Sequence, residues 1–447
     1  MDNLYQAIFE GLAPAAKTAV QEALDAGKGP QAIIDDSMIP AMEAIGTEFE
    51  AGRAFVPNLL LSARAMKSAL DILKPLMMAE QTATLGTVVI GTVKGDLHDI
   101  GKNLVASMLE GRGFKVINLG ADVGKERFVE AARENNADIV AMSALLTTTM
   151  DYMKDVVDAV RESGLDVKIM VGGAPITQEF ADEIGADIYG RRRSRKCRFR
   201  RQDRCRRLQF QCKRCCCSCQ TASGMLVSRE FRLSPVDVPE KDIWFAMGYR
   251  DAVPEERIRR IVLEYRDALV PQAVIKYMYQ VVEAEKLSST QVIMGGKLFS
   301  PRGIICSYLK GMTHAVIFVG TAGREFDAAL RKLHAEGDIL ADFVADSIGS
   351  VLAESSVSQI EKDNKSWEGH ISLSYSPGYC DWNIREQHLL FSLFPDEPCG
   401  IRLSDSSLMS PEKSVSGFFA LGEELQRQPY HCEICKNTRC YKRKNAG

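Results

Sequence analysis

The stretch Asp96-Leu97-His98-Asp99-Ile100-Gly101 follows the apolar run Thr87-Val88-Val89-Ile90-Gly91-Thr92-Val93 and precedes a segment with helical spacing, 102–110. The apolar run predicts a buried strand, so the polar stretch falls on a loop at its carboxyl end, where open α/β sheets bind cofactors. An Asp-x-His spacing suits a metal ligand, because the carboxylate can hold one ring N–H and leave the other nitrogen for a metal. A loop histidine beside an aspartate can also be simply solvated.

Two further signals follow at the ends of apolar runs. Ser143-Ala144-Leu145 begins 42 residues after Gly101, and Gly172-Gly173 begins 27 residues after Leu145. The chain between residues 86 and 190 alternates expected strands with expected helices, which predicts a parallel sheet of the Rossmann or flavodoxin type. The expected strands are 88–92, 116–119, 139–143, 168–171 and 187–189, and the expected helices are 101–112, 125–134, 147–163 and 176–184.

The three-part spacing Asp-x-His-x-x-Gly, Ser-x-Leu and Gly-Gly resembles the cobalamin-binding domain of methionine synthase and the small corrinoid proteins of methyltransferase systems. The resemblance covers residues 1–190. It implies cobalamin, as methylcobalamin, with His98 as the lower axial ligand of cobalt, Asp96 orienting that imidazole and Ser143 extending the hydrogen-bond relay. It also implies that Leu145, Gly101, Gly172 and Gly173 lie against the cofactor, since glycine lets the backbone approach the nucleotide tail.

Residues 1–80 show apolar spacing typical of four helices, with short breaks containing glycine or proline, which predicts an antiparallel bundle. The segment 55–67 is similar to the helical cap that covers the cobalt face in methionine synthase. In the alternative interpretation, Phe55, Leu59 and Met66 are ordinary bundle core. We therefore expect a helical cap over 1–85 and a cobalamin-binding domain over 86–190.

Charge and cysteine content change sharply after residue 190. Residues 1–190 carry 16 Lys and Arg against 28 Asp and Glu, whereas 191–224 carry 13 against one and contain seven cysteines. Three interpretations of residues 191–224 are open. The segment is a basic arm that binds nucleic acid, or a metal-binding tract. Alternatively it results from a frameshift in a coding region that should encode an alanine-rich helix, which the fold lacks here. We favour the frameshift. In each case the dense charge predicts a disordered linker.

Residues 225–447 are globular again and resemble the activation domain of cobalamin-dependent methionine synthase, which implies a separate α+β domain. Helices are expected over 254–269, 324–334 and 338–360, and strands over 291–295, 315–319 and 372–379. In that family the Pro377-Gly378-Tyr379 turn helps to bind S-adenosylmethionine. Ser374 stands where many members have arginine, which weakens the expected recognition of the ligand's carboxylate.

The tail holds Cys432, Cys435 and Cys440 in the spacing Cys-x2-Cys-x4-Cys. Thiolates at this spacing can converge on zinc, with His431 as a fourth ligand, or on an iron–sulfur cluster that supplies electrons. A solvated tail with free thiols is the alternative.

Together the resemblances imply a multi-domain α/β protein that carries methyl groups on cobalamin in a methyltransferase system, with a domain for reactivation. The implied partners are a separate substrate-specific methyltransferase, a methyl acceptor protein and a reductive activator, with neither nucleic acid nor membrane. The alternatives are a cobalamin-sensing regulator, a partial methionine synthase and a mutase subunit. No apolar run approaches the ~18–20 residues of a membrane span, and no secretory signal is readable, so a cytoplasmic location is expected.

Overall fold

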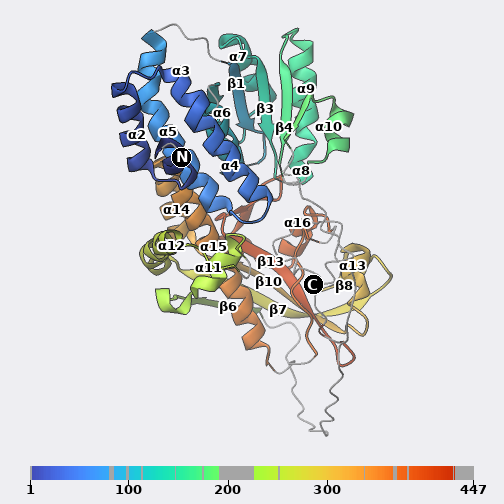
Figure 1. The fold of residues 1–447 in the computed structure, drawn as a ribbon. Helices are drawn as coiled ribbons and strands as arrows, with labels where there is room; N and C mark the ends of the chain where they lie inside the picture. Colours follow the sequence, from blue (N-terminus) through green and yellow to red (C-terminus); the bar gives the residue numbers. More distant parts are fainter. Residues whose placement is uncertain are drawn as a thin grey trace, which may run out of the picture.

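The computed structural model of the protein describes residues 3–79, 85–96, 100–111, 114–145, 147–173, 176–190, 226–249, 252–336, 338–365, 370–379, 382–425 and 427. Helices of the N-terminal region and a parallel sheet lie side by side at one end of the molecule, and a second sheet with its own helices lies at the other end (Figure 1). We call residues 226–427 the C-terminal half. No helix within the described ranges is both long enough and apolar enough to cross a membrane.

The N-terminal helices bury one apolar face each and share a core, which includes Ile8, Val20, Met38, Met66 and Leu73. The expected helical region is confirmed. Its elements are α1 (Asn3–Phe9), α2 (Ala13–Asp25), α3 (Pro30–Ile33), the π-helical turn η1 (Ile34–Met38), α4 (Ile39–Glu50) and α5 (Val56–Ala79). Leu59 and Met66 belong to this core, as the ordinary-core interpretation holds. Phe55 instead packs against residues of the C-terminal half.

The first sheet is wholly parallel, with the order β2-β1-β3-β4-β5. This order is that of the flavodoxin-like fold, so the expected fold class is confirmed. The strands are β1 (Thr87–Thr92), β2 (Lys115–Asn118), β3 (Ile139–Ser143), β4 (Lys168–Gly172) and β5 (Ile188–Gly190). The helices are α6 (Ile100–Gly111), α7 (Lys125–Glu134), α8 (Thr147–Met150), α9 (Tyr152–Glu162) and α10 (Gln178–Ile184). The helix expected over 147–163 is two helices, separated at Asp151.

The second sheet is antiparallel, with the order β13-β10-β7-β8-β9 and β6 paired to β7. The strands are β6 (Leu226–Phe231), β7 (Ile275–Lys286), β8 (Val292–Met294), β9 (Lys297–Phe299), β10 (His314–Thr321) and β13 (Ser414–Leu421), and a separate ribbon pairs β11 (Arg402–Leu403) with β12 (Met409–Ser410). The helices are α11 (Glu240–Ala246), α12 (Glu256–Leu269), α13 (Arg302–Ser307), α14 (Arg324–Glu336), α15 (Ile339–Asp363) and α16 (Glu386–Phe391).

The prediction of a strand over 372–379 is wrong. The segment makes only two isolated bridges to β13, at Ile371 and Tyr375, and then turns. The central strand β7 went unpredicted although its buried and partly exposed residues alternate from Ile275 to Val282, which is the period of a half-buried strand. Strands β7 and β10 therefore form the centre of this sheet, β13 lies at its edge, and 371–375 only lines that edge strand.

Candidate functional site

The buried carboxylate of Asp96 lies at the carboxyl end of the parallel sheet, in the loop that follows β1. The Asp96 side chain is fully buried. Its Oδ2 atom accepts hydrogen bonds from the backbone N–H of Leu145, at 2.7 Å, and from the hydroxyl of Thr149, at 2.9 Å. Burying a carboxylate is costly unless such donors surround it. The Asp96 carboxylate thus joins the end of strand β1 to the loop after β3 and to helix α8.

The backbone around Asp96 is fixed by a neighbouring aspartate. The N–H of Gly95 donates to Asp122 Oδ1 at 2.7 Å, and the N–H of Asp122 donates to the carbonyl oxygen of Asp96 at 3.0 Å. The N–H of Asp96 donates to the carbonyl oxygen of Val93 at 3.1 Å. Sequence reasoning missed both Thr149 and Asp122. The run Thr147-Thr148-Thr149, which follows Leu145 and Leu146, was the available signal for Thr149.

The glycines expected near the cofactor, Gly101, Gly172 and Gly173, have different surroundings. Gly173 has φ +142°, and a Cβ atom built on it would lie 1.8 Å from the carbonyl oxygen of Ala144. Close packing of β4 against the loop after β3 therefore requires glycine there, whatever is bound. A Cβ atom on Gly101, at the start of α6, would meet no atom of the described residues within 4 Å. Gly172 pairs with Ser143 between β4 and β3.

Of the other residues predicted for this edge, the structure describes Leu145 and Ser143 but not His98. Leu145 is 42% exposed, although it is a large apolar residue beside a buried carboxylate. Ser143 ends β3 at the same edge, and its part in a relay stays a prediction. His98 lies outside the described residues. The structure thus brings Asp96, Leu145, Ser143, Gly172 and Gly173 to one edge, together with the unpredicted Thr149.

A serine turn of the C-terminal half reaches the same edge. A Cβ atom built on Gly95 would lie 3.6 Å from the Cβ of Ser406 and 3.5 Å from the Thr149 methyl carbon. The Ser404 side chain accepts the N–H of Leu408 at 3.0 Å, which closes the turn. Ser407 is 2% exposed, and its hydroxyl has no hydrogen-bond partner among the residues that the structure describes. The carboxyl edge of the parallel sheet therefore faces polar groups of the C-terminal half.

The Pro377-Gly378-Tyr379 turn is present in the C-terminal half. The N–H of Gly378 donates to the carbonyl oxygen of Trp382 at 2.8 Å, and the N–H of Tyr379 donates to that of Ser376 at 3.2 Å. Tyr379 is 37% exposed. Cys432, Cys435 and Cys440 and the tract 191–224 lie outside the described residues. Within the described part of the chain, no three Cys, His, Asp or Glu side chains gather as metal ligands.

The carboxyl edge fits a cobalamin held by an imidazole. A buried, firmly oriented carboxylate stands two residues before His98, and second-sphere carboxylates of this kind orient metal-bound histidines. Among the described residues, the surroundings of Gly101 are uncrowded and Leu145 exposes an apolar side chain, which suits contact with a partly apolar group. The edge is also where flavodoxin-like sheets bind cofactors.

Comparisons with known proteins agree with this geometry. A family model described as B12 binding domain matches residues 86–196, and a second model of the same description matches residues 1–74. The trimethylamine corrinoid protein 2 of Methanosarcina acetivorans is 50% identical over 179 residues, which are 39% of this chain and 82% of that protein.

Two solved structures are also similar to parts of the chain. The methanol:cobalamin methyltransferase complex MtaBC of Methanosarcina barkeri is 34% identical, with 42% of this chain and 72% of that chain covered and a TM-score of 0.39. The MetH reactivation domain bound to AdoHcy is 16% identical, with 46% and 82% covered and a TM-score of 0.36. Through its B12 binding domains and its identity to the trimethylamine protein, the chain belongs to the family of cobalamin-binding corrinoid proteins.

Proposed function

We propose that this corrinoid protein carries methyl groups on cobalamin between a separate methylamine-specific methyltransferase and a methyl acceptor protein. The buried Asp96 carboxylate, fixed by Leu145 and Thr149 at the end of β1, is the observation that carries the proposal. Methylamines are the proposed methyl donors because the relative with 50% identity is a trimethylamine corrinoid protein. When bound, cobalamin supplies a cobalt atom that accepts and releases the methyl group.

Each residue at the edge has a proposed role toward that cofactor. His98 would supply the imidazole that ligates cobalt. Asp96 would orient that ring through Oδ1, while Oδ2 accepts the hydrogen bonds of Leu145 and Thr149. Ser143 extends the relay, and Gly101, Gly172 and Gly173 adjoin the nucleotide tail. Neighbouring hydrogen bonds of this kind set both the orientation and the basicity of a metal-bound histidine.

Replacing His98 with alanine is expected to remove the spectrum of imidazole-bound cobalamin from the full-length protein and to leave weaker binding through the nucleotide tail. The reason is that the substitution removes the ligand atom without adding bulk. The measurement is the visible absorption spectrum of the purified, cobalamin-loaded protein, with His388→Ala on α16 as the matched histidine control. An unchanged cobalt spectrum in His98→Ala would contradict the assignment.

We propose further that the C-terminal half serves reactivation of the cofactor and binds S-adenosylmethionine weakly at the Pro377-Gly378-Tyr379 turn. The turn and the exposed ring of Tyr379 support binding. Ser374 cannot give a carboxylate the charge-assisted bidentate bond that arginine gives. A metal or an iron–sulfur cluster at Cys432, Cys435 and Cys440, which would supply electrons for this step, stays a prediction.

Introducing Ser374→Arg is expected to tighten S-adenosylmethionine binding at least about tenfold, because a hydrogen bond to a charged group contributes about 1.5–3 kcal/mol. Isothermal titration calorimetry on the full-length protein measures this, with Ser374→Gln as a neutral control of comparable reach. Tight binding by the native protein, unchanged in the arginine variant, would show that position 374 does not face the ligand's carboxylate.

A further inference from the structure

Two loops lie next to each other at the carboxyl edge of the parallel sheet. Residues 93–99, between β1 and α6, are called the histidine loop here, and residues 119–124 connect β2 to α7. The N–H of Thr92 donates to the carbonyl oxygen of Gly120 at 3.0 Å, and the N–H of Val123 donates to that of Thr92 at 2.9 Å. The pairing of β1 with β2 thus continues to the point where both loops begin.

Asp122 holds the beginning of the histidine loop. Its Oδ1 atom accepts the N–H of Gly95 at 2.7 Å, and its own N–H donates to the carbonyl oxygen of Asp96 at 3.0 Å. Asp122 has φ +56°, a left-handed conformation that residues other than glycine, asparagine and aspartate rarely adopt. Such conformations are often found at functional sites, where the surrounding structure imposes them. A left-handed aspartate therefore holds the two residues that stand two and three positions before His98.

Lys102 and Asn103 hold the first turn of α6, just beyond the histidine loop. Lys102 is 2% exposed, and its ammonium group donates to Asn118 Oδ1 at 2.6 Å. The same oxygen accepts the N–H of Gly120 at 3.1 Å, and Asn118 Nδ2 donates to Asn103 Oδ1 at 3.0 Å. Because both groups that face Oδ1 are donors, they fix the orientation of the Asn118 amide. A buried ammonium group needs such acceptors, so displacing this turn is costly.

These two sets of contacts, the anchors, flank His98 in the sequence. Asp96 lies two residues before His98, and Lys102 lies four residues after it. Both anchors end on the same short stretch, residues 118–122. Fixing both ends of a short segment lowers its conformational entropy. A ligand residue that is restricted in advance loses less freedom when it binds, which strengthens its binding.

We propose that Asp122 and Asn118 are positioning residues for the cobalt ligand, and that their two anchors favour binding of the His98 imidazole over its release. The inference rests on the proposed function, in which His98 ligates cobalt. It assigns a role to the loop after β2, which acts through Asp96 and Lys102 without contact between the positioning side chains and the imidazole. Loosening either anchor should therefore favour imidazole-free cobalamin that stays bound through its nucleotide tail.

The test uses the full-length protein loaded with methylcobalamin and measures the ratio of imidazole-bound to imidazole-free cofactor by visible absorption. Asp122→Gly removes the carboxylate without backbone strain, since glycine adopts positive φ readily. Asn118→Ala removes the other anchor. We expect each to lower the ratio about tenfold, the equivalent of one hydrogen bond, and both together about a hundredfold. Asp122→Asn and Asn118→Asp keep the accepting oxygen and should restore the native ratio.

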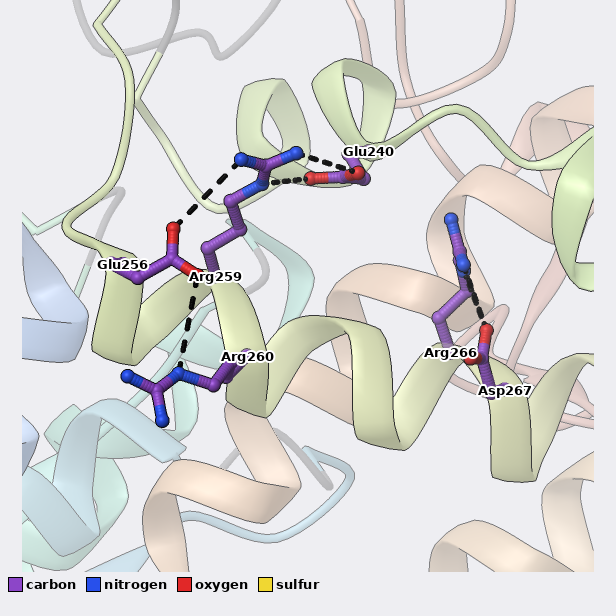
Figure 2. Close-up of polar contacts among 6 residues, drawn as sticks. All are labelled: Glu240, Glu256, Arg259, Arg260, Arg266 and Asp267. Carbon is purple, nitrogen blue, oxygen red and sulfur yellow. Dashed lines mark hydrogen bonds and ion pairs between the residues drawn. The ribbon is translucent and has the colours of Figure 1, made fainter.

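Two further variants control for a general loss of stability. Asn136, between α7 and β3 at the opposite edge of the sheet, is also left-handed, with φ +44°, so Asn136→Gly makes a matched backbone change. Arg259 on α12 donates to both oxygens of Glu240 on α11, at 2.7 and 3.3 Å, and pairs with Glu256 (Figure 2). Arg259→Met thus removes a charged link within the C-terminal half. Both controls should keep the native ratio.

Hydrogen exchange of the Gly95 amide in the cofactor-free protein tests the first anchor without cobalamin. Exchange should become about tenfold faster in Asp122→Gly and stay native in Asp122→Asn. Unchanged exchange, a native cobalt spectrum in the double variant, or an equal shift in Asn136→Gly would overturn the inference, even where His98→Ala removes the imidazole-bound spectrum. A native protein that shows no imidazole-bound spectrum would instead overturn the proposed function and, with it, this inference.

Discussion

Replacing Asp96 with alanine is expected to lower the free energy of unfolding by about 2–4 kcal/mol and to weaken cobalamin binding strongly. The substitution leaves the N–H of Leu145 and the hydroxyl of Thr149 without their acceptor, and each such donor costs about 1–3 kcal/mol when buried. Urea denaturation of the cofactor-free protein measures the first effect, and titration with cobalamin measures the second.

Asp96→Asn separates these two effects. Both hydrogen bonds from Leu145 and Thr149 end on Oδ2, so an amide can keep an oxygen there and place its NH2 group at the Oδ1 position. We expect stability within about 1 kcal/mol of the native protein. The cobalt spectrum should nonetheless change, because the amide then presents a donor to the His98 ring N–H. A native spectrum in Asp96→Asn would show that Oδ1 does not orient the imidazole.

Gly173→Ala is expected to destabilise the protein by about 3 kcal/mol or more. The new Cβ would lie 1.8 Å from the Ala144 carbonyl oxygen, and at φ +142° an L-residue is strained in any case. Backbone cannot yield as a flexible side chain can, so the loop after β3 must move and displace Leu145. Urea denaturation of the cofactor-free protein measures the loss.

The matched substitution Gly101→Ala should act in the opposite direction on stability. Its Cβ meets no atom of the described part of the chain within 4 Å, and alanine favours helix over glycine by up to about 0.5–1 kcal/mol. Cobalamin affinity should fall about tenfold if the nucleotide tail adjoins this position, as proposed. A more stable variant with native affinity would remove Gly101 from the cofactor site and leave the other assignments standing.

Local periodicity determined much of the fold. Strand β3 has the predicted bounds, Ile139–Ser143, and helix α7 has the predicted 125–134, because each buries one regular face that the spacing of apolar residues displays. Asp96, Gly172 and Gly173 were chosen because their spacing resembles that of corrinoid proteins, and the parallel strands bring them to one edge of the sheet. The wrong strand over 372–379 shows the limit. Pairing of 371–375 with β13 is confined to isolated bridges, which local composition does not reveal.

Only the tertiary structure decided which surfaces meet. Thr149 contacts Asp96 across 53 residues of sequence, and Arg257 contacts Gly11 across 246. An apolar pattern states that a face is buried but not what buries it, which is why Phe55 could be interpreted as bundle core or cofactor cover and is found against Tyr249. The amino-acid sequence by itself determined the flavodoxin-like sheet and the family. The partner of the cap was decided by long-range packing, because several apolar surfaces compete for the same helix and only their shapes and polar rims distinguish them.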